Sequence, residues 1–198
     1  MNVIIGIDEV GRGPVAGPVA VGAFCFRDTK VMRAARAFGV PIRDSKKLTR
    51  IQREKWFTQI KIWKKQNMCD FAVTMISAQQ IDKIGISKAI KQALAKSLYK
   101  LKPEFKNQIL LDGGLKAPIE FKNQKTIIKG DEKFPVISFA SIVAKVTRDN
   151  YMYTQAKKFP KYGFENHVGY GTKAHYEAIK KYGMTDLHRR SFLKTFKK

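Results

Sequence analysis

Short apolar runs separated by glycine and proline alternate with longer amphipathic segments along this chain. Residues 3–7 and 19–26 are two such runs, and they favour a neighbouring antiparallel pair of strands in a buried sheet. A third strand is predicted over residues 71–76. Two more are indicated by the stretches QILLDGG and KTIIKGD, in each of which an aspartate follows an apolar run beside glycine.

Helical periodicity fills the intervening segments. Thr49, followed three residues later by Gln52, forms the sequence signature of a capping box, so a helix is predicted to begin there. Trp56 and Trp63 recur in it at helical spacing, and we expect them to pack in the core rather than to stack on bases. Further helices are predicted over residues 86–101, ending before Pro103, and over 139–158, 173–181 and 189–197.

This order of elements indicates an α/β fold. Early strands, then alternating helices and strands, predict a mixed sheet with helices packed against its faces. The 198 residues suit one domain, taken as residues 1–198 with a helical C-terminal portion over about residues 172–198. The sequence contains no internal repeat, low-complexity tract or linker.

The charge of the chain suggests a class of partner. Lysine and arginine together number 39, against 16 aspartates and glutamates, which gives a formal charge of +23. Such an excess favours a polyanionic partner, with nucleic acid as the leading candidate, although a solvated lysine-rich surface gives the same composition. Hydrophobic residues make up 44% of the chain, enough for a substantial core, which argues against disorder over most of its length.

Two cysteines and the N-terminal stretch indicate the compartment. Cys25 and Cys69 lie in apolar runs with no partner at metal-ligand spacing, which predicts buried, reduced thiols and no disulfide or zinc framework. The stretch MNVIIGIDE lacks the basic flank and cleavage site of a signal peptide, and no apolar run reaches membrane-spanning length. We therefore expect a soluble cytoplasmic protein without a membrane partner.

Four acids, Asp8, Glu9, Asp112 and Asp131, fall at the carboxyl ends of predicted strands, where ligands of α/β folds tend to bind. Taken singly, each is more typical of a turn or a helix cap. Convergence of several carboxylates is costly unless cations or protons offset the repulsion, so a cluster in a chain this poor in acids suggests a metal site. Carboxylates without cysteine or closely spaced histidine suit Mg²⁺ or Mn²⁺. Two such ions would permit phosphodiester hydrolysis, one generating the nucleophile and the other stabilising the leaving oxygen.

Three glycines in the stretch GIDEVGRGPVAGPVA allow two interpretations. Gly11, Gly13 and Gly17 approach the spacing of a dinucleotide-binding fingerprint, but the β-like VAVGAFCF follows where a helix would have to hold the pyrophosphate. The glycines on either side of Arg12 instead leave the main chain free to approach a sugar edge closely. A ribose 2′-hydroxyl, which both donates and accepts a hydrogen bond, would suit that main chain.

The neighbouring acids present a geometric difficulty. Adjacent residues of a regular strand face opposite sides of the sheet, so Asp8 and Glu9 share one site only if the strand twists or ends there. Gly11 makes such a local departure credible. Of the two acids, Asp8 is the more secure bridging ligand.

Six motifs carry a resemblance to a known family. They are GIDEVGRGPVAGPV, DSKKL, LLDGG, KGDEKFPVISFASIVAKVTRD, GFENHVGYGTKAH and HRRSF, and they run in order from Gly6 to Phe192. Together they resemble the successive motifs of bacterial ribonuclease HII over essentially the whole chain. The resemblance implies a ribonuclease H-like fold, with a mixed five-stranded sheet and a helical C-terminal part.

The resemblance also implies an activity. The family's enzymes are metal-dependent endoribonucleases that act on RNA/DNA hybrids and on duplex DNA containing ribonucleotides. Incision on the 5′ side of a single embedded ribonucleotide, leaving 3′-hydroxyl and 5′-phosphate ends, is implied, as part of ribonucleotide removal in DNA replication and repair. Asp8, Glu9, Asp112 and Asp131 match the family's four metal-binding catalytic acids, for which Mg²⁺ or Mn²⁺, with two ions during catalysis, is expected.

Substrate-binding roles carry over residue by residue. Gly11, Arg12 and Gly13 match the turn that recognises the 2′-hydroxyl through main-chain atoms, and Tyr170 matches the tyrosine that stacks on the neighbouring deoxyribose. More loosely, five residues are carried over as phosphate contacts, since lysine and serine commonly position a nucleic-acid backbone: Ser45, Lys46, Lys47, Ser141 and Lys145.

The segment HRRSF leaves two roles open. His188, Arg189 and Arg190 either hold the helical tail or touch DNA, and their types do not choose between these roles.

Three rival interpretations differ in what they predict. Ribonuclease HIII shares the fold but carries an N-terminal substrate-binding domain, for which we expect no room before Asp8. A catalytically silent nucleic-acid-binding module would bind through charge without cutting. A resolvase-like or transposase-like nuclease of the same broad fold would cut without requiring a ribonucleotide. We expect a monomer, because the chain has no coiled-coil pattern.

Overall fold

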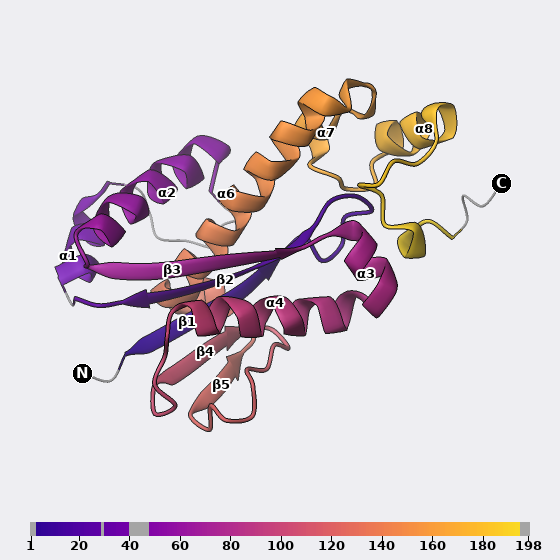
Figure 1. Ribbon diagram of the computed structural model, residues 1–198. Coiled ribbons are helices and arrows are strands. Elements are labelled where there is room, and N and C mark those ends of the chain that lie inside the picture. The colour runs from indigo at the N-terminus through magenta and orange to yellow at the C-terminus, as the bar shows by residue number, and fades with distance from the viewer. Residues whose placement is uncertain (1–2, 29, 40–47, 195–198) are drawn as a thin grey trace.

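Five strands form one mixed sheet in the computed structural model, which describes residues 3–28, 30–39 and 48–194. The strand order is β3-β2-β1-β4-β5 (Figure 1). Strands β1, β2 and β3 pair antiparallel, whereas β4 and β5 run parallel to β1. The strands are β1 (Ile4–Val10), β2 (Val19–Phe26), β3 (Cys69–Ile76), β4 (Gln108–Asp112) and β5 (Gln124–Ile127).

Helices cover both faces of the sheet, and the C-terminal helical segments lie beyond one end of its strands (Figure 1). One face packs against α1 (Lys30–Ala37), α2 (Arg50–Lys65) and the long α6 (Pro135–Lys158). The other face packs against α3 (Ala78–Ile84) and α4 (Ile86–Lys100). The remaining helical segments are α5 (Gly130–Lys133), η1 (Pro160–Tyr162), α7 (Phe164–His167), α8 (Lys173–Tyr182) and η2 (Arg190–Phe192).

Helix α6 lies unusually close to the sheet because two glycines face it. A Cβ atom on Gly6 would stand 2.3 Å from the carbonyl of Val136, and one on Gly22 would stand 2.3 Å from the carbonyl oxygen of Ala140. Only glycine permits so close a contact between helix and strand main chains. The N-terminal half of α6 is therefore buried almost all round, as expected of a helix at the centre of a fold.

Several sequence predictions are confirmed by this architecture. The sheet is mixed and five-stranded, and Thr49 with Gln52 forms the reciprocal hydrogen bonds of a capping box at the start of α2. Trp56 and Trp63 are buried in the core, as expected. Cys25 and Cys69 are free, buried thiols, and burial raises their pKa values to about 11 and about 12.

Other predictions were wrong at element boundaries. Strand β1 runs on to Val10 because it keeps pairing with β2 there, so Asp8 lies inside the strand rather than beyond its end. Helix α6 begins at Pro135, four residues before the predicted start, since proline suits the first helical position. The helix predicted over 189–197 is absent from the described residues up to 194, where the single 3₁₀ turn η2 stands in its place.

Among the described residues, no helix combines the length and the apolar character needed to cross a lipid bilayer.

Candidate metal centre and nucleic-acid site

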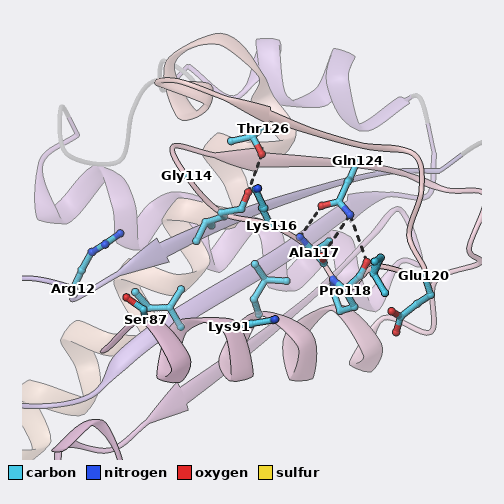
Figure 2. A pocket seen from close by; sticks show the side chains of 14 residues that line it. Arg12, Ser87, Lys91, Gly114, Lys116, Ala117, Pro118, Glu120, Gln124 and Thr126 are labelled. Atoms are coloured by element: carbon cyan, nitrogen blue, oxygen red, sulfur yellow. Dashed lines mark hydrogen bonds between the residues drawn. The ribbon is translucent and has the colours of Figure 1, made fainter. Parts of the chain in front are cut away.

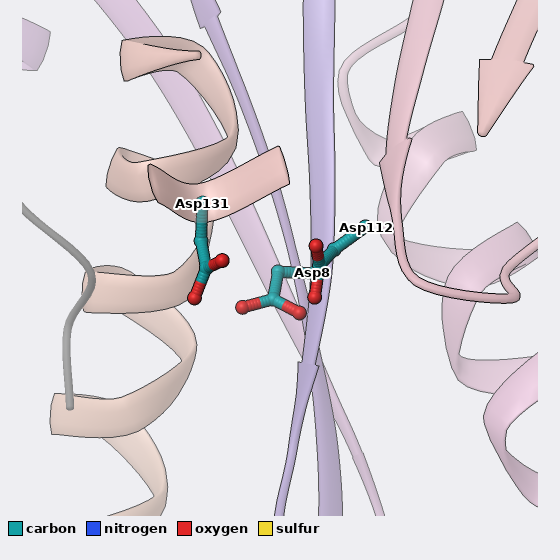
Figure 3. A group of neighbouring side chains, drawn as sticks. All are labelled: Asp8, Asp112 and Asp131. Atoms are coloured by element: carbon teal, nitrogen blue, oxygen red, sulfur yellow. The ribbon is translucent and has the colours of Figure 1, made fainter. Parts of the chain in front are cut away.

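Three aspartates from separate elements meet beside the central strand. Asp8 lies within β1, Asp112 ends β4, and Asp131 lies in the first turn of α5. Each offers a carboxylate oxygen, and these oxygens all lie within 4.8 Å of one another. Figure 3 shows the three side chains directed toward a common point. The fold thus brings together three of the four acids singled out in the sequence.

Asp8 is the most deeply buried of the three, with 3% of its surface exposed. Burial raises its pKa well above the ordinary value, and the charges of Asp112, Glu9 and Asp131 raise it further. A hydrogen bond from the Ser141 hydroxyl acts in the opposite direction, because it stabilises the charged carboxylate. The ionised form of Asp8 is therefore disfavoured, and a bound cation would offset the repulsion among these carboxylates.

The main chain around residues 129–131 positions the other two aspartates. The amide of Gly130 donates to Asp112 Oδ1 at 2.6 Å, which ties the end of β4 to the start of α5. Lys129, in the left-handed region with φ of 54°, turns the chain from β5 into that helix. Asp131 follows in the first helical turn and is buried. The sequence placed Asp131 at the end of a strand, whereas this turn places it on a helix.

The donor set fits a hard divalent cation. Three carboxylates with no cysteine or histidine in the group are the ligands that Mg²⁺ and Mn²⁺ prefer. Opposite oxygens around Mg²⁺ are about 4.2 Å apart, from metal–oxygen distances of about 2.1 Å. The spacing of the three aspartates is compatible with this size, so Asp8, Asp112 and Asp131 could hold such an ion after small side-chain movements.

Glu9 lies outside this three-aspartate group. Along β1, side chains alternate, so Glu9 shares the side of Ile5 and Ile7, which pack in the core on the α4 face. It forms an ion pair with Arg12, with Arg12 Nη1 3.7 Å from Glu9 Oε1. The geometric difficulty noted in the sequence is therefore real, and the strand alternation separates the two neighbouring acids.

The glycine turn and Tyr170 lie side by side. A Cβ atom on Gly13 would stand 4.0 Å from Tyr170 Cε1, so the tyrosine ring borders this residue. Tyr170 is 44% exposed, and Arg12 and Gly13 are exposed as well. Gly11 is buried with a φ of 83°, a conformation that favours glycine. The glycine turn and Tyr170, far apart in the sequence, thus form one accessible surface. The glycine turn itself begins three residues after Asp8 in the chain.

Comparison with known proteins identifies the family. Residues 5–195 match the family model described as Ribonuclease HII. The chain belongs to the ribonuclease HII family. The ribonuclease HII of Caldicellulosiruptor bescii is 43% identical over 191 residues, which cover 96% of this chain and 86% of that protein. This family member is accordingly a ribonuclease H endonuclease.

Solved structures agree on the fold. The chain resembles the ribonuclease HII seen in a complex with PCNA from Archaeoglobus fulgidus, with a TM-score of 0.75 and 26% identity, covering 94% of this chain and 93% of that one. It also resembles a Bst ribonuclease HIII structure in complex with Mn²⁺, with a TM-score of 0.67 and 20% identity, covering 98% of this chain and 70% of that one. The second likeness concerns the fold alone.

The remaining residues carried over from the ribonuclease HII resemblance occupy different settings. Ser141 is 1% exposed, and its hydroxyl bonds to Asp8, so it contacts the three-aspartate group from within the protein. Lys145 Nζ pairs with Asp149 Oδ2 at 3.0 Å, and burial lowers the pKa of this lysine. Ser45, Lys46 and Lys47 lie outside the described residues, and the phosphate-binding role of all five residues stays a prediction.

The sequence analysis overlooked Arg148. This arginine is fully buried in α6, where Nε donates to the carbonyl of Pro18 at 2.9 Å and Nη2 to that of Ala16 at 3.3 Å. One signal was available, because Arg148 continues a helical segment whose preceding residues are mostly apolar, from Val136 to Ala144. Buried arginines are rare unless hydrogen-bonded, so such a residue indicates an internal partner.

A groove of about 980 Å³ lies on the α4 side of the sheet (Figure 2). Ser87 and Lys91 line it from α4, Lys116 lines it from the segment after β4, and Arg12 also contributes. The three aspartates are not among its lining residues. The groove of this ribonuclease HII therefore lies apart from the three-aspartate group, and it adjoins the glycine turn at Arg12.

All three histidines of the chain gather beneath Tyr170. The rings of His167 and His175 stack with centroids 4.4 Å apart, and His175 Nε2 lies 3.2 Å from His188 Nε2. Burial lowers the pKa values of His175 and His188 to about 4. The positive charge of Arg190 acts in the same direction on His188. Both rings are therefore neutral at pH 7.

Acid is expected to destabilise the protein through these two rings. Above pH 6.5 they are neutral in both folded and unfolded chains, whereas between pH 6.5 and about 4 only the unfolded chain binds the protons. Stability should fall as pH falls through this window, by about 3 kcal/mol for each ring.

Urea unfolding of the metal-free Asp8→Asn variant from pH 7.5 to 4.5 checks this expectation. That variant removes the opposing effect of Asp8, whose raised pKa makes protonation favour the folded state. A flat free energy of unfolding across this range would show that the two rings titrate normally.

Proposed function

We propose that this chain is a divalent-cation-dependent endoribonuclease that hydrolyses the RNA strand of RNA/DNA hybrids and incises 5′ of single ribonucleotides embedded in duplex DNA. The products are a 3′-hydroxyl and a 5′-phosphate, as required for ribonucleotide removal in replication and repair. One observation carries the proposal. Asp8 belongs to the three-aspartate group, and the turn that begins three residues later at Gly11 forms an exposed surface with Tyr170.

Each acid has a proposed part in this reaction. Asp8, Asp112 and Asp131 hold a cation, Mg²⁺ or Mn²⁺, and Ser141 orients the Asp8 carboxylate. When bound, a divalent cation supplies the positive charge that phosphodiester hydrolysis requires. We assign Glu9 to a second cation, because it adjoins Asp8 in sequence but lies outside the three-aspartate group.

We propose that the surface beside the metal centre recognises the sugar of the substrate. Main-chain atoms of Gly11, Arg12 and Gly13 approach the 2′-hydroxyl, since the glycines present no Cβ atom to obstruct the sugar. Tyr170, next to Gly13, stacks on the following deoxyribose. Together they test whether a ribose precedes a deoxyribose, which places incision on the 5′ side of an isolated ribonucleotide.

The charge of the chain supports a nucleic-acid substrate. A net charge of +23 favours binding to the phosphate backbone without regard to base sequence. Lys145 and the lysines of DSKKL are proposed to contribute phosphate contacts. We propose a cytoplasmic monomer, with the free, buried state of both cysteines in keeping with a reducing compartment.

Three duplexes test the proposal: all-DNA, DNA with one ribonucleotide, and a full RNA/DNA hybrid, each with Mg²⁺ or Mn²⁺ and with EDTA. We expect cation-dependent cleavage of both ribonucleotide-containing duplexes, with a single cut 5′ of the isolated ribonucleotide. Cutting of all-DNA would favour a resolvase-like nuclease. Tight binding without cutting would favour a silent nucleic-acid-binding module.

Gly13→Ala should separate recognition from folding. The added methyl group would make only an ordinary 4.0 Å contact with Tyr170, so the melting temperature should not change. It would, however, occupy the surface proposed for the sugar edge. We expect kcat/KM for the single-ribonucleotide duplex to fall about 100-fold, equivalent to about 2.7 kcal/mol. Equal activity of variant and wild type would show that the sugar does not approach Gly13.

A further inference from the structure

Residues 187–189 pair with one part of the proposed sugar reader, and that part is bonded in turn to the other. We call residues 11–18 the reader loop and residues 168–171 the tyrosine turn. Gly17 N donates to the Leu187 carbonyl at 2.7 Å, and Arg189 N donates to the Val15 carbonyl at 2.8 Å. Val15 N in turn donates to the Gly169 carbonyl at 2.9 Å. Main-chain hydrogen bonds therefore join the HRRSF segment, the reader loop and the tyrosine turn.

Arg189 holds the reader loop from beneath. Its side chain is fully buried and donates three hydrogen bonds to main-chain carbonyls. Nη2 bonds to the Gly11 oxygen at 2.6 Å, Nη1 to the Arg12 oxygen at 2.9 Å, and Nε to the Gly17 oxygen at 2.9 Å. A buried guanidinium is costly unless its donors are satisfied, and here each of its three nitrogen atoms donates to a loop carbonyl.

These bonds determine where the loop amides point. In a trans peptide the carbonyl and the following N–H point in opposite directions. Because Arg189 draws the Gly11 carbonyl inward, the Arg12 N–H is directed outward. The inward Arg12 carbonyl directs the Gly13 N–H outward in the same way. Arg189 thus aims two main-chain donors at the surface where a sugar hydroxyl would lie.

A chain of histidines holds the tyrosine turn. The Thr185 amide donates to His188 Nδ1 at 2.9 Å, so the proton of neutral His188 must be on Nε2. That proton is donated to His175 Nε2, 3.2 Å away, which leaves the His175 proton on Nδ1. Nδ1 lies 2.8 Å from the Tyr170 carbonyl, which can only accept. Every donor therefore meets an acceptor, from Thr185 to the main chain of Tyr170.

We propose that His188 and Arg189 are positioning residues for substrate discrimination: Arg189 orients the reader loop, and His188, acting through His175, fixes the main chain that carries Tyr170. This inference rests on the proposed function of the reader loop and Tyr170. His188 and Arg189 are internal, which assigns them a role other than touching DNA. Two neighbouring residues thereby set the geometry of both halves of the reader.

The wild-type protein provides the first test, which does not depend on activity. Nitrogen-15 NMR of the imidazole rings at pH 7 reports which nitrogen of each histidine is protonated. We expect His188 in the Nε2–H form and His175 in the less common Nδ1–H form. Finding His175 in the Nε2–H form, or either ring charged at pH 7, would break the chain of donors and overturn the part assigned to His188.

Variant kinetics on two substrates provide the second test. Arg189→Lys retains the charge but cannot bond to three carbonyls. Because every ribose must be read, its kcat/KM should fall about 100-fold on both the single-ribonucleotide duplex and the full hybrid, equivalent to about 2.7 kcal/mol. Arg190→Lys, at an exposed position in the same segment, is the matched control and should behave as wild type.

His175 variants probe the tyrosine turn separately. His175→Ala should lower kcat/KM about tenfold more on the single-ribonucleotide duplex than on the hybrid, because only the former presents a deoxyribose to Tyr170. His175→Asn, whose amide can replace the Nδ1–H donor, should partly restore this ratio.

The outcomes distinguish a positioning role from a structural one. Lower melting temperatures with wild-type kcat/KM for Arg189→Lys, and an unchanged substrate ratio for His175→Ala, would overturn the proposal. If these variants do not fold, the NMR result decides the histidine chain. A wild-type protein that cleaves no ribonucleotide-containing duplex would reject the proposed function itself, whatever the histidine tautomers.

Discussion

Asp8→Asn is expected to abolish cleavage of every ribonucleotide-containing duplex while leaving the fold intact. Asp8 is the buried member of the three-aspartate group, and its neutral replacement removes a charged ligand from the proposed cation site. A cation contributes several kcal/mol to such reactions, so kcat should fall by at least about 1,000-fold. Cleavage of the single-ribonucleotide duplex under single-turnover conditions measures this loss directly.

The same variant should change the response of the protein to metal. Mn²⁺ should raise the melting temperature of the wild type, because it binds the folded state, and should have little effect on Asp8→Asn. Without metal, the variant should be at least as stable as the wild type, since it lacks a buried acid among Glu9, Asp112 and Asp131.

Asp186→Asn removes one exposed carboxylate and is the matched control, for which activity and metal response should match the wild type. An active Asp8→Asn enzyme would refute the proposed metal centre.

Gly6→Ala is expected to have the largest effect on stability. The new Cβ atom would stand 2.3 Å from the carbonyl carbon and oxygen of Val136 and 2.6 Å from the amide of Ile137, all main-chain atoms of α6. No side-chain rotation relieves such a contact, so α6 must move away from β1. We expect a loss of about 3 kcal/mol, or a fall of about 6–12 °C in melting temperature for a chain of this size.

Activity should fall with stability in Gly6→Ala, because Asp8 follows two residues later on the same face of β1 and Ser141 lies on the displaced helix. Gly114→Ala is the matched control. Nothing lies within 4 Å of a Cβ atom at Gly114, so stability should change by less than about 0.5 kcal/mol. A Gly6→Ala protein as stable as the wild type would show that α6 can withdraw from β1 at little cost.

The sequence by itself determined the order of the main elements and the family. Apolar periodicity located the five strands and most of the long helices. It could do so because the spacing of apolar residues follows from which face of a strand or helix is buried. Six motifs spanning Gly6 to Phe192 indicated ribonuclease HII, which the family match over residues 5–195 confirms. The four acids were singled out among the 16 of the chain by their positions at the ends of predicted strands and by the motifs that contain them.

Only the tertiary structure decided which of those residues lie together and which contacts each of them makes. Pairing of β1 with β2 as far as Val10 keeps the strand regular, so Asp8 enters the three-aspartate group and Glu9 turns toward Arg12. The internal position of Arg189 depends on contacts with residues more than 150 positions away in the sequence, such as Gly11. The histidine contacts join residues much closer in sequence, but they form only once the segments of residues 167–175 and 185–188 pack together. Local pattern carries no information about such pairs, because the same arginine and histidine types suit solvent, nucleic acid or a buried carbonyl equally well.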